Sequence, residues 1–89
     1  MIERRVAIVN ELGLHARAAA RLVRTAGEYR SRVQLVKDGE EADAKSILSV
    51  LLLAAAKGTE LKVRCEGPDE QQAIDAVSRL IAERFGEES

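Results

Sequence analysis

Apolar and polar residues follow two different periods along this chain. Residues 60–66 alternate strictly between apolar and charged side chains, which predicts a strand with one buried and one wet face. Residues 4–9 and 32–37 also favour strands. The Asp38-Gly39 pair predicts a tight turn from residues 32–37 into a short strand at residues 41–44. The pattern therefore indicates a hairpin and two further strands.

Between these strands lie segments with the spacing of amphipathic helices. The first follows the loop Asn10–Gly13 and runs to about Ala26, with Gly27 as a stop signal. A second helix begins at the N-cap candidate Ser46 and ends at Lys57-Gly58. The first helix presents an apolar stripe to the core, which consists of Ala19, Leu22, Val23 and Ala26.

A third helix follows Gly67-Pro68. Asp69 is placed to cap it, with Gln72 reaching back from the capping-box position. Three amphipathic helices and a sheet with one polar face bury their apolar sides only as two layers, so we predict an α+β fold with the helices on one side. The buried stripe of the third helix consists of Ala73, Ile74, Val77, Leu80 and Ile81.

The size of the chain limits the kind of site that it can build. With 89 residues and 46% apolar content, we expect one domain over residues 1–89 and a small core, which favours a surface site over a deep cavity. Fourteen basic and fifteen acidic residues nearly cancel, so the overall charge gives no general attraction for nucleic acid or an anionic membrane. The longest apolar run, Val50–Ala56, is seven residues and too short to span a membrane.

Cys65 is the only cysteine, which excludes an internal disulfide and leaves too few thiols for a zinc or iron–sulfur centre. Its place on the apolar phase of residues 60–66 predicts an inert core thiol. The first five residues show no secretory pattern. We therefore expect a cytoplasmic protein.

His15 is the only histidine and lies where the predicted loop becomes the first helix, two positions before Arg17. At a helix N-terminus, unpaired amides and the positive end of the dipole favour a bound anion and disfavour a cationic imidazole. We expect a neutral, nucleophilic His15, with the first-turn amides and Arg17 holding a transferred phosphoryl group. A solvated capping histidine is the plainer alternative. Arg17, Arg21 and Arg24 share one side of the helix, which forms either a docking surface for an acidic partner or a solvated face.

The segment Gly13–Ala19, with the sequence GLHARAA, closely resembles the phosphohistidine motif of the HPr family, the carriers of the bacterial phosphoenolpyruvate:sugar phosphotransferase system. The resemblance extends to Ala44–Leu48, Ala56–Glu60 and Glu66–Glu70 at the spacings of the family, and it covers residues 2 to about 85. It implies four antiparallel strands under three helices in the order βαββαβα.

By this resemblance, His15 receives phosphate on Nδ1 from phosphorylated enzyme I and donates it to a histidine of an enzyme IIA, while Arg17 steadies the phosphoryl group. Such a carrier is not itself an enzyme, is expected to be a monomer and requires no cofactor or protein-bound metal. The family usually has proline after the motif arginine, whereas this chain has Ala18. A regulatory HPr paralogue, whose phosphorylation state controls binding to target proteins rather than sugar uptake, is therefore the alternative.

Two further features carry two interpretations each. In many bacteria the serine that corresponds to Ser46 is phosphorylated by HPr kinase/phosphorylase, which adds charge that would perturb partner docking, whereas its plainer role is a helix cap. The second helix also has more apolar residues than one stripe requires. Ile47, Leu48 and Leu51 are therefore candidates for partner contact as well as for core packing.

Two other classes of function compete with the carrier. A nucleic-acid-binding domain needs stacking aromatics and a basic face, whereas Tyr29 and Phe85 are the only aromatics and the net charge is −1, so we expect no nucleic-acid partner. A small phosphate-handling enzyme would use Arg17 as an anion clamp and His15 as general acid or base, without partner proteins. We also expect no direct membrane insertion.

Overall fold

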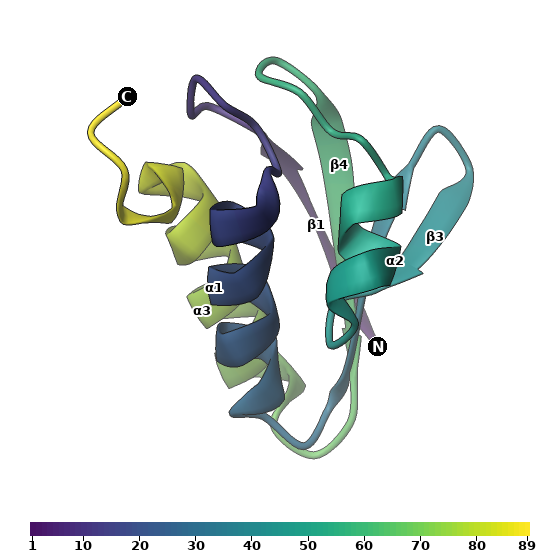
Figure 1. Ribbon diagram of the computed structural model, residues 1–89. Helices are drawn as coiled ribbons and strands as arrows, with labels where there is room; N and C mark the ends of the chain where they lie inside the picture. Colours follow the sequence, from purple (N-terminus) through teal and green to yellow (C-terminus); the bar gives the residue numbers. More distant parts are fainter.

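Four strands form one antiparallel sheet in the spatial order β1-β4-β2-β3 (Figure 1). The computed structural model describes residues 1–89. The first strand begins and ends two residues earlier than predicted, and β4 has the predicted bounds. The strands are β1 (Ile2–Ala7), β2 (Arg32–Lys37), β3 (Glu40–Asp43) and β4 (Glu60–Glu66).

Three helices cover one face of this sheet (Figure 1). Together with the strands they follow the order βαββαβα, which confirms the predicted α+β class. A turn of 3-10 helix at the C-terminus, η1, was not predicted. None of the helices combines the length and the apolar character needed to cross a membrane. The helices are α1 (Ala16–Gly27), α2 (Ile47–Leu52), α3 (Glu70–Ala82) and η1 (Arg84–Gly86).

The core between the two layers consists of 21 buried apolar residues. Strand β4 runs through the middle of the sheet, so its apolar face, made of Leu61, Val63 and Cys65, is fully covered. Burial raises the pKa of the Cys65 thiol to about 11, with a smaller contribution from the charge of Glu70. A thiol that stays protonated inside the core is unreactive, as its sequence position predicted.

Helix α2 is shorter than predicted. The predicted end at Lys57-Gly58 is wrong, because the helix stops at Leu52 and Ala54 adopts a left-handed φ of 52° that turns the chain away. The turned segment then passes beside the loop that precedes α1, where the Leu14 amide donates to the Ala55 carbonyl at 2.9 Å. This early stop therefore brings the end of α2 next to the start of α1.

The start of α3 also differs from the prediction. Asp69 occupies the N-cap position but makes no capping bond, because its carboxylate accepts from Ser31 and from the Arg30 amide instead. The predicted capping box with Gln72 is wrong, since it is the Glu70 carboxylate that reaches back, to the Gly67 amide at 3.1 Å.

Candidate functional site

His15 is the N-cap residue of α1, as its position in the sequence predicted. Its backbone is extended, with φ −75° and ψ 177°, and its carbonyl accepts from the Ala19 amide at 2.8 Å. The ring atom Nδ1 accepts from the Arg17 amide at 3.3 Å, a position that a serine or asparagine oxygen occupies in most helices. The side chain is 24% exposed, so the ring is accessible from solvent.

The loop before His15 is held by close backbone packing. Gly13 has a left-handed φ of 64°, and a Cβ atom at this position would lie 2.5 Å from the Ala55 carbonyl oxygen. The Asn10 side chain, which is fully buried, donates from Nδ2 to the Gly13 carbonyl at 2.8 Å. These contacts fix the point at which the chain enters α1, and with it the position of the histidine.

The second ring nitrogen of His15 meets a carboxylate from the other end of the chain. His15 Nε2 contacts Glu87 Oε2, and Glu87 Oε1 accepts from Asn10 Nδ2 at 2.8 Å. Burial alone would raise the pKa of the Glu87 carboxyl, but the hydrogen bonds from Asn10 and His15 and the nearby charge of Arg17 lower it below its ordinary value. Glu87 is therefore an ionised acceptor beside the ring.

The C-terminal tail that carries Glu87 is anchored at several points. Phe85 is buried in the core, and both it and Arg84 adopt left-handed φ values, of 55° and 60°, that turn the chain back toward α1. The Arg21 guanidinium donates to the Phe85 carbonyl, and the Glu11 amide donates to the Ser89 carbonyl at 2.6 Å. The tail thus lies against the first half of α1 and the loop before it.

The three arginines of the predicted stripe have different surroundings. Arg17 is exposed and takes part in none of the ion pairs of the chain, and its charge lies close enough to Glu87 to lower the pKa of that carboxyl. Arg24 is also exposed. Arg21 is half-buried and bound to the Phe85 carbonyl, which gives it a structural role in holding the tail. The stripe therefore does not form one continuous docking surface.

Ser46 caps α2, since its hydroxyl oxygen accepts from the Ser49 amide at 3.3 Å. The predicted capping role is therefore confirmed, and the side chain is half-buried.

The apolar residues of α2 divide between the core and the surface. Ile47 and Leu48 are 45% and 66% exposed, whereas Leu51 packs partly against the core. Sequence reasoning missed Leu52 and Leu12, which are 71% and 69% exposed. The only signal for Leu52 was its place in an apolar run too wide for one stripe. We call the four exposed residues, Leu12, Ile47, Leu48 and Leu52, the apolar surface.

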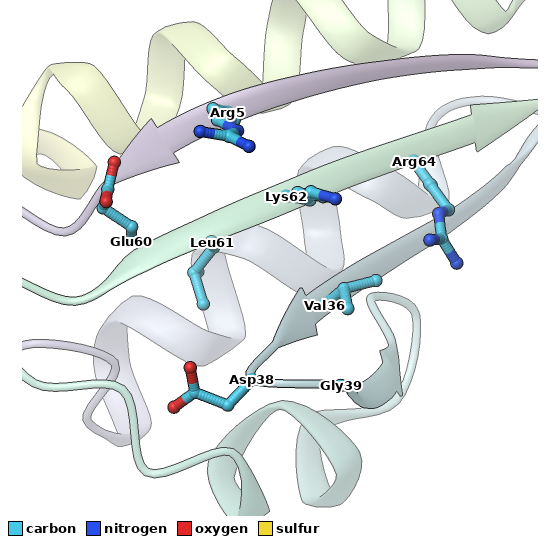
Figure 2. A pocket seen from close by; sticks show the side chains of 8 residues that line it. All are labelled: Arg5, Val36, Asp38, Gly39, Glu60, Leu61, Lys62 and Arg64. Carbon is cyan, nitrogen blue, oxygen red and sulfur yellow. The ribbon is translucent and has the colours of Figure 1, made fainter.

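The uncovered face of the sheet carries a shallow hollow that, unlike the apolar surface, is lined mostly by polar and charged residues. Figure 2 shows Arg5 and Lys62 side by side in it, directed away from the helices, with Asp38 and Glu60 among its lining residues. Neither aromatic side chain lines this hollow, so it lacks the stacking groups of an RNA-binding sheet. No group of three or more His, Cys, Asp or Glu side chains is placed to hold a metal ion.

Fold and site together define a small two-layer α+β protein that presents a histidine ring at the start of its first helix. Residues 2–83 match the family model described as "PTS HPr component phosphorylation site". The phosphocarrier protein HPr of Cupriavidus necator is 49% identical over 87 residues, 98% of each chain. The crystal structure of HPr-C-His from Thermoanaerobacter tengcongensis has a TM-score of 0.96 at 42% identity and covers 100% of both chains. The chain belongs to the HPr family of the phosphotransferase system.

Crh, the catabolite repression containing protein of Bacillus subtilis, is similar as well. Its crystal structure has a TM-score of 0.77 at 37% identity and covers 94% of this chain and 97% of that one. That structure is described as a dimer with a swapped domain. This chain is therefore similar both to phosphocarrier proteins and to a catabolite-repression protein.

Proposed function

We propose that this chain is a cytoplasmic phosphocarrier that accepts a phosphoryl group on His15 from phosphorylated enzyme I and passes it to enzyme IIA proteins. The observation that carries the proposal is the orientation of the ring, whose Nδ1 atom faces the first turn of α1 at the Arg17 amide. The chain acts as a carrier in partner-dependent steps and not as an enzyme with its own small substrate.

The chemistry follows from this orientation. The lone pair of His15 Nδ1 forms a bond to phosphorus while the nitrogen–phosphorus bond of the donor histidine breaks, and the donor nitrogen keeps that electron pair. Because one nitrogen–phosphorus bond replaces another, the chain has only to position the group and balance its charge. The exposed Arg17 guanidinium and the Ala16 amide, which has no backbone acceptor, are the donors available for the phosphoryl oxygens.

Partner proteins would dock on the side of the molecule that carries His15. The end of α2, which carries Leu52, packs beside the loop before α1, which carries Leu12, and His15 follows that loop. Where such exposed apolar residues form a contiguous patch, they mark a site of protein–protein contact. We propose that Ile47 and Leu48 contact enzyme I and enzyme IIA, with Arg24 adding charge at the edge, and that the chain acts as a monomer.

The test is phosphorylation by phosphoenolpyruvate and enzyme I. We expect one phosphate per chain that is acid-labile and base-stable, as a phosphohistidine is, and no labelling of a folded His15→Ala variant. Unchanged labelling of that variant would end the carrier proposal. Release of inorganic phosphate from a small phosphate ester without any partner protein would instead support the enzyme alternative.

A regulatory member of the family is the second candidate, and Ala18 together with the similarity to Crh favours it. In this case phosphorylation of His15, or of Ser46 by HPr kinase/phosphorylase, would control binding to target proteins. A phosphorylated chain that binds target proteins but does not pass phosphate to any enzyme IIA would support the regulator over the carrier.

A further inference from the structure

Glu87 has no part in the carrier chemistry described so far, yet its side chain is only 11% exposed and its carboxylate contacts the proposed nucleophile. It lies 72 residues from His15 along the chain. An acidic side chain in a charged C-terminal segment is ordinarily solvated. A carboxylate that is held away from solvent against an imidazole requires a different explanation.

We propose that Glu87 is a positioning residue that keeps the proton of the His15 ring on Nε2 and so leaves the lone pair on Nδ1. This inference rests on the proposed phosphocarrier function. An ionised carboxylate can only accept a hydrogen bond, so its contact requires a proton on Nε2. On the other side of the ring, the Arg17 amide donates to Nδ1, which requires a lone pair there. Both contacts therefore select the same tautomer.

The carboxylate is itself held in place. Asn10 is fully buried, and its Nδ2 group donates to Glu87 Oε1 and to the Gly13 carbonyl, each at 2.8 Å. Because the asparagine amide is fixed by the backbone next to His15, it fixes the carboxylate relative to the ring. The buried Phe85, two residues before Glu87, restrains the tail from its other side. Glu87 thus orients the His15 ring, and Asn10 in turn orients Glu87.

The contact between His15 and Glu87 also stabilises the charge that the ring carries during phosphoryl transfer. When Nδ1 bonds to phosphorus, the ring gains positive charge while the proton remains on Nε2, where Glu87 stabilises it. When the phosphoryl group leaves for the next histidine, the electron pair returns to Nδ1 and the ring is neutral again with the same proton in place. No proton has to move in either direction. A buried aspartate holds the imidazole of serine-protease triads in a comparable way.

The decisive variant is Glu87→Gln. The Asn10 amide would hold the glutamine oxygen, so the glutamine NH₂ group would face His15 Nε2 and require a lone pair there. The ring proton would then move to Nδ1, with loss of the long 3.3 Å hydrogen bond from the Arg17 amide, and block the nucleophile. We expect the ¹⁵N chemical shifts of the ring, measured at about pH 8 where an imidazole is neutral, to change from the Nε2–H to the Nδ1–H pattern. We expect phosphorylation by enzyme I to slow by about tenfold or more, with the final stoichiometry unchanged.

Glu88→Gln is the matched control, because it makes the same change of charge at the next, exposed residue of the tail. It should leave both the ring shifts and the rate as in the original chain. Glu87→Ala removes the acceptor without supplying a donor, so it should slow transfer less than Glu87→Gln does. A purely structural role would lower the thermal midpoint of both Glu87 variants and leave the tautomer unchanged, which would overturn the inference.

The ring measurement needs no donor protein, so the two proposals can fail separately. Identical ring shifts in Glu87→Gln and Glu88→Gln would overturn the role of Glu87, whatever the labelling shows. An original chain with the Nε2–H tautomer that takes no phosphate on His15 would contradict the carrier function instead.

Discussion

Ser31 and Asp69 bind each other in both directions. The Ser31 hydroxyl and amide donate to Asp69 Oδ1 at 2.5 and 2.8 Å, and the Asp69 amide donates to the Ser31 hydroxyl oxygen at 3.2 Å. The pair ties the start of β2 to the start of α3. The hydrogen bond from the Ser31 hydroxyl, followed by that from the Arg30 amide, lowers the pKa of Asp69 from 3.8 to about 2.

This lowered pKa predicts how the stability depends on pH. A carboxyl whose pKa is lower in the folded state stabilises the fold above about pH 4, and this contribution is lost as the pH falls through about 2. The free energy of unfolding of the original chain should therefore exceed that of Asp69→Asn near neutral pH, and the gap should narrow between about pH 4 and pH 2. Urea unfolding across this range measures it. Asp38→Asn, in the exposed hairpin turn, is the control and should show no such narrowing, whereas a constant gap for Asp69→Asn would contradict the prediction.

Substitution of Arg17 should affect transfer far more than folding. Its guanidinium is exposed and free of ion pairs, so Arg17→Ala should leave the thermal midpoint nearly unchanged. Loss of a charge-assisted hydrogen bond to the phosphoryl group, worth about 1.5–3 kcal/mol, should slow transfer by about ten- to a hundredfold. Rapid-quench phosphorylation measures the rate. Arg32→Ala, which removes the same charge from the uncovered face of the sheet, is the control and should transfer at more than half the original rate. An equally slow Arg32→Ala would remove the special role of Arg17.

Substitutions of Ser46 separate its two proposed roles. Ser46→Ala deletes the bond to the Ser49 amide and should lower the free energy of unfolding by about 1 kcal/mol. Ser46→Asp keeps a capping oxygen and adds negative charge, so it should retain most of the stability while weakening transfer from enzyme I. Ser49→Ala, which removes a hydroxyl from the same helix without touching the cap, is the stability control. Normal transfer by Ser46→Asp would count against regulation at this residue.

Much of the layered fold could be predicted because it depends on local patterns. The alternation of residues 60–66 and the Asp38-Gly39 turn predicted β4 and the hairpin, since each is determined by neighbouring residues. The end of α2 could not be predicted in this way, because Ala54 takes a left-handed φ without a glycine to indicate it. At the start of α3, Ser31 competes for Asp69 from another part of the chain, and no local rule includes such a competitor.

The candidate site was predictable only in part for the same reason. His15 and Arg17 belong to one short motif, and a helix N-terminus explains their proximity. Glu87 and Asn10 have no pattern that connects them to this motif. Glu87 meets His15 and Asn10 only because the left-handed residues of η1, Arg84 and Phe85, turn the tail back onto α1. Contacts across the whole length of the chain depend on tertiary structure, which periodicity does not encode.

Gly13 offers a test of the backbone that supports His15. Gly13→Ala would place a Cβ atom 2.5 Å from the Ala55 carbonyl oxygen at a left-handed φ of 64°. We expect a loss of about 2 kcal/mol in the free energy of unfolding, together with slower phosphorylation, since the loop must shift to relieve the contact. Gly58 also has a left-handed φ, of 90°, but no atom lies within 4 Å of an added Cβ. The loss of unfolding free energy in Gly58→Ala therefore measures the cost of the backbone conformation alone. Equal losses in the two variants would show that the contact with Ala55 is not tight.

The place of β1 in the sheet has a consequence for how the protein is made. Its only neighbour is β4, with Ile2 opposite Cys65, so β1 has no partner in the sheet until residues 60–66 have been synthesised. The carboxylate that faces His15 arrives later still. A chain that stops before Glu87 therefore carries His15 without the carboxylate that contacts its ring.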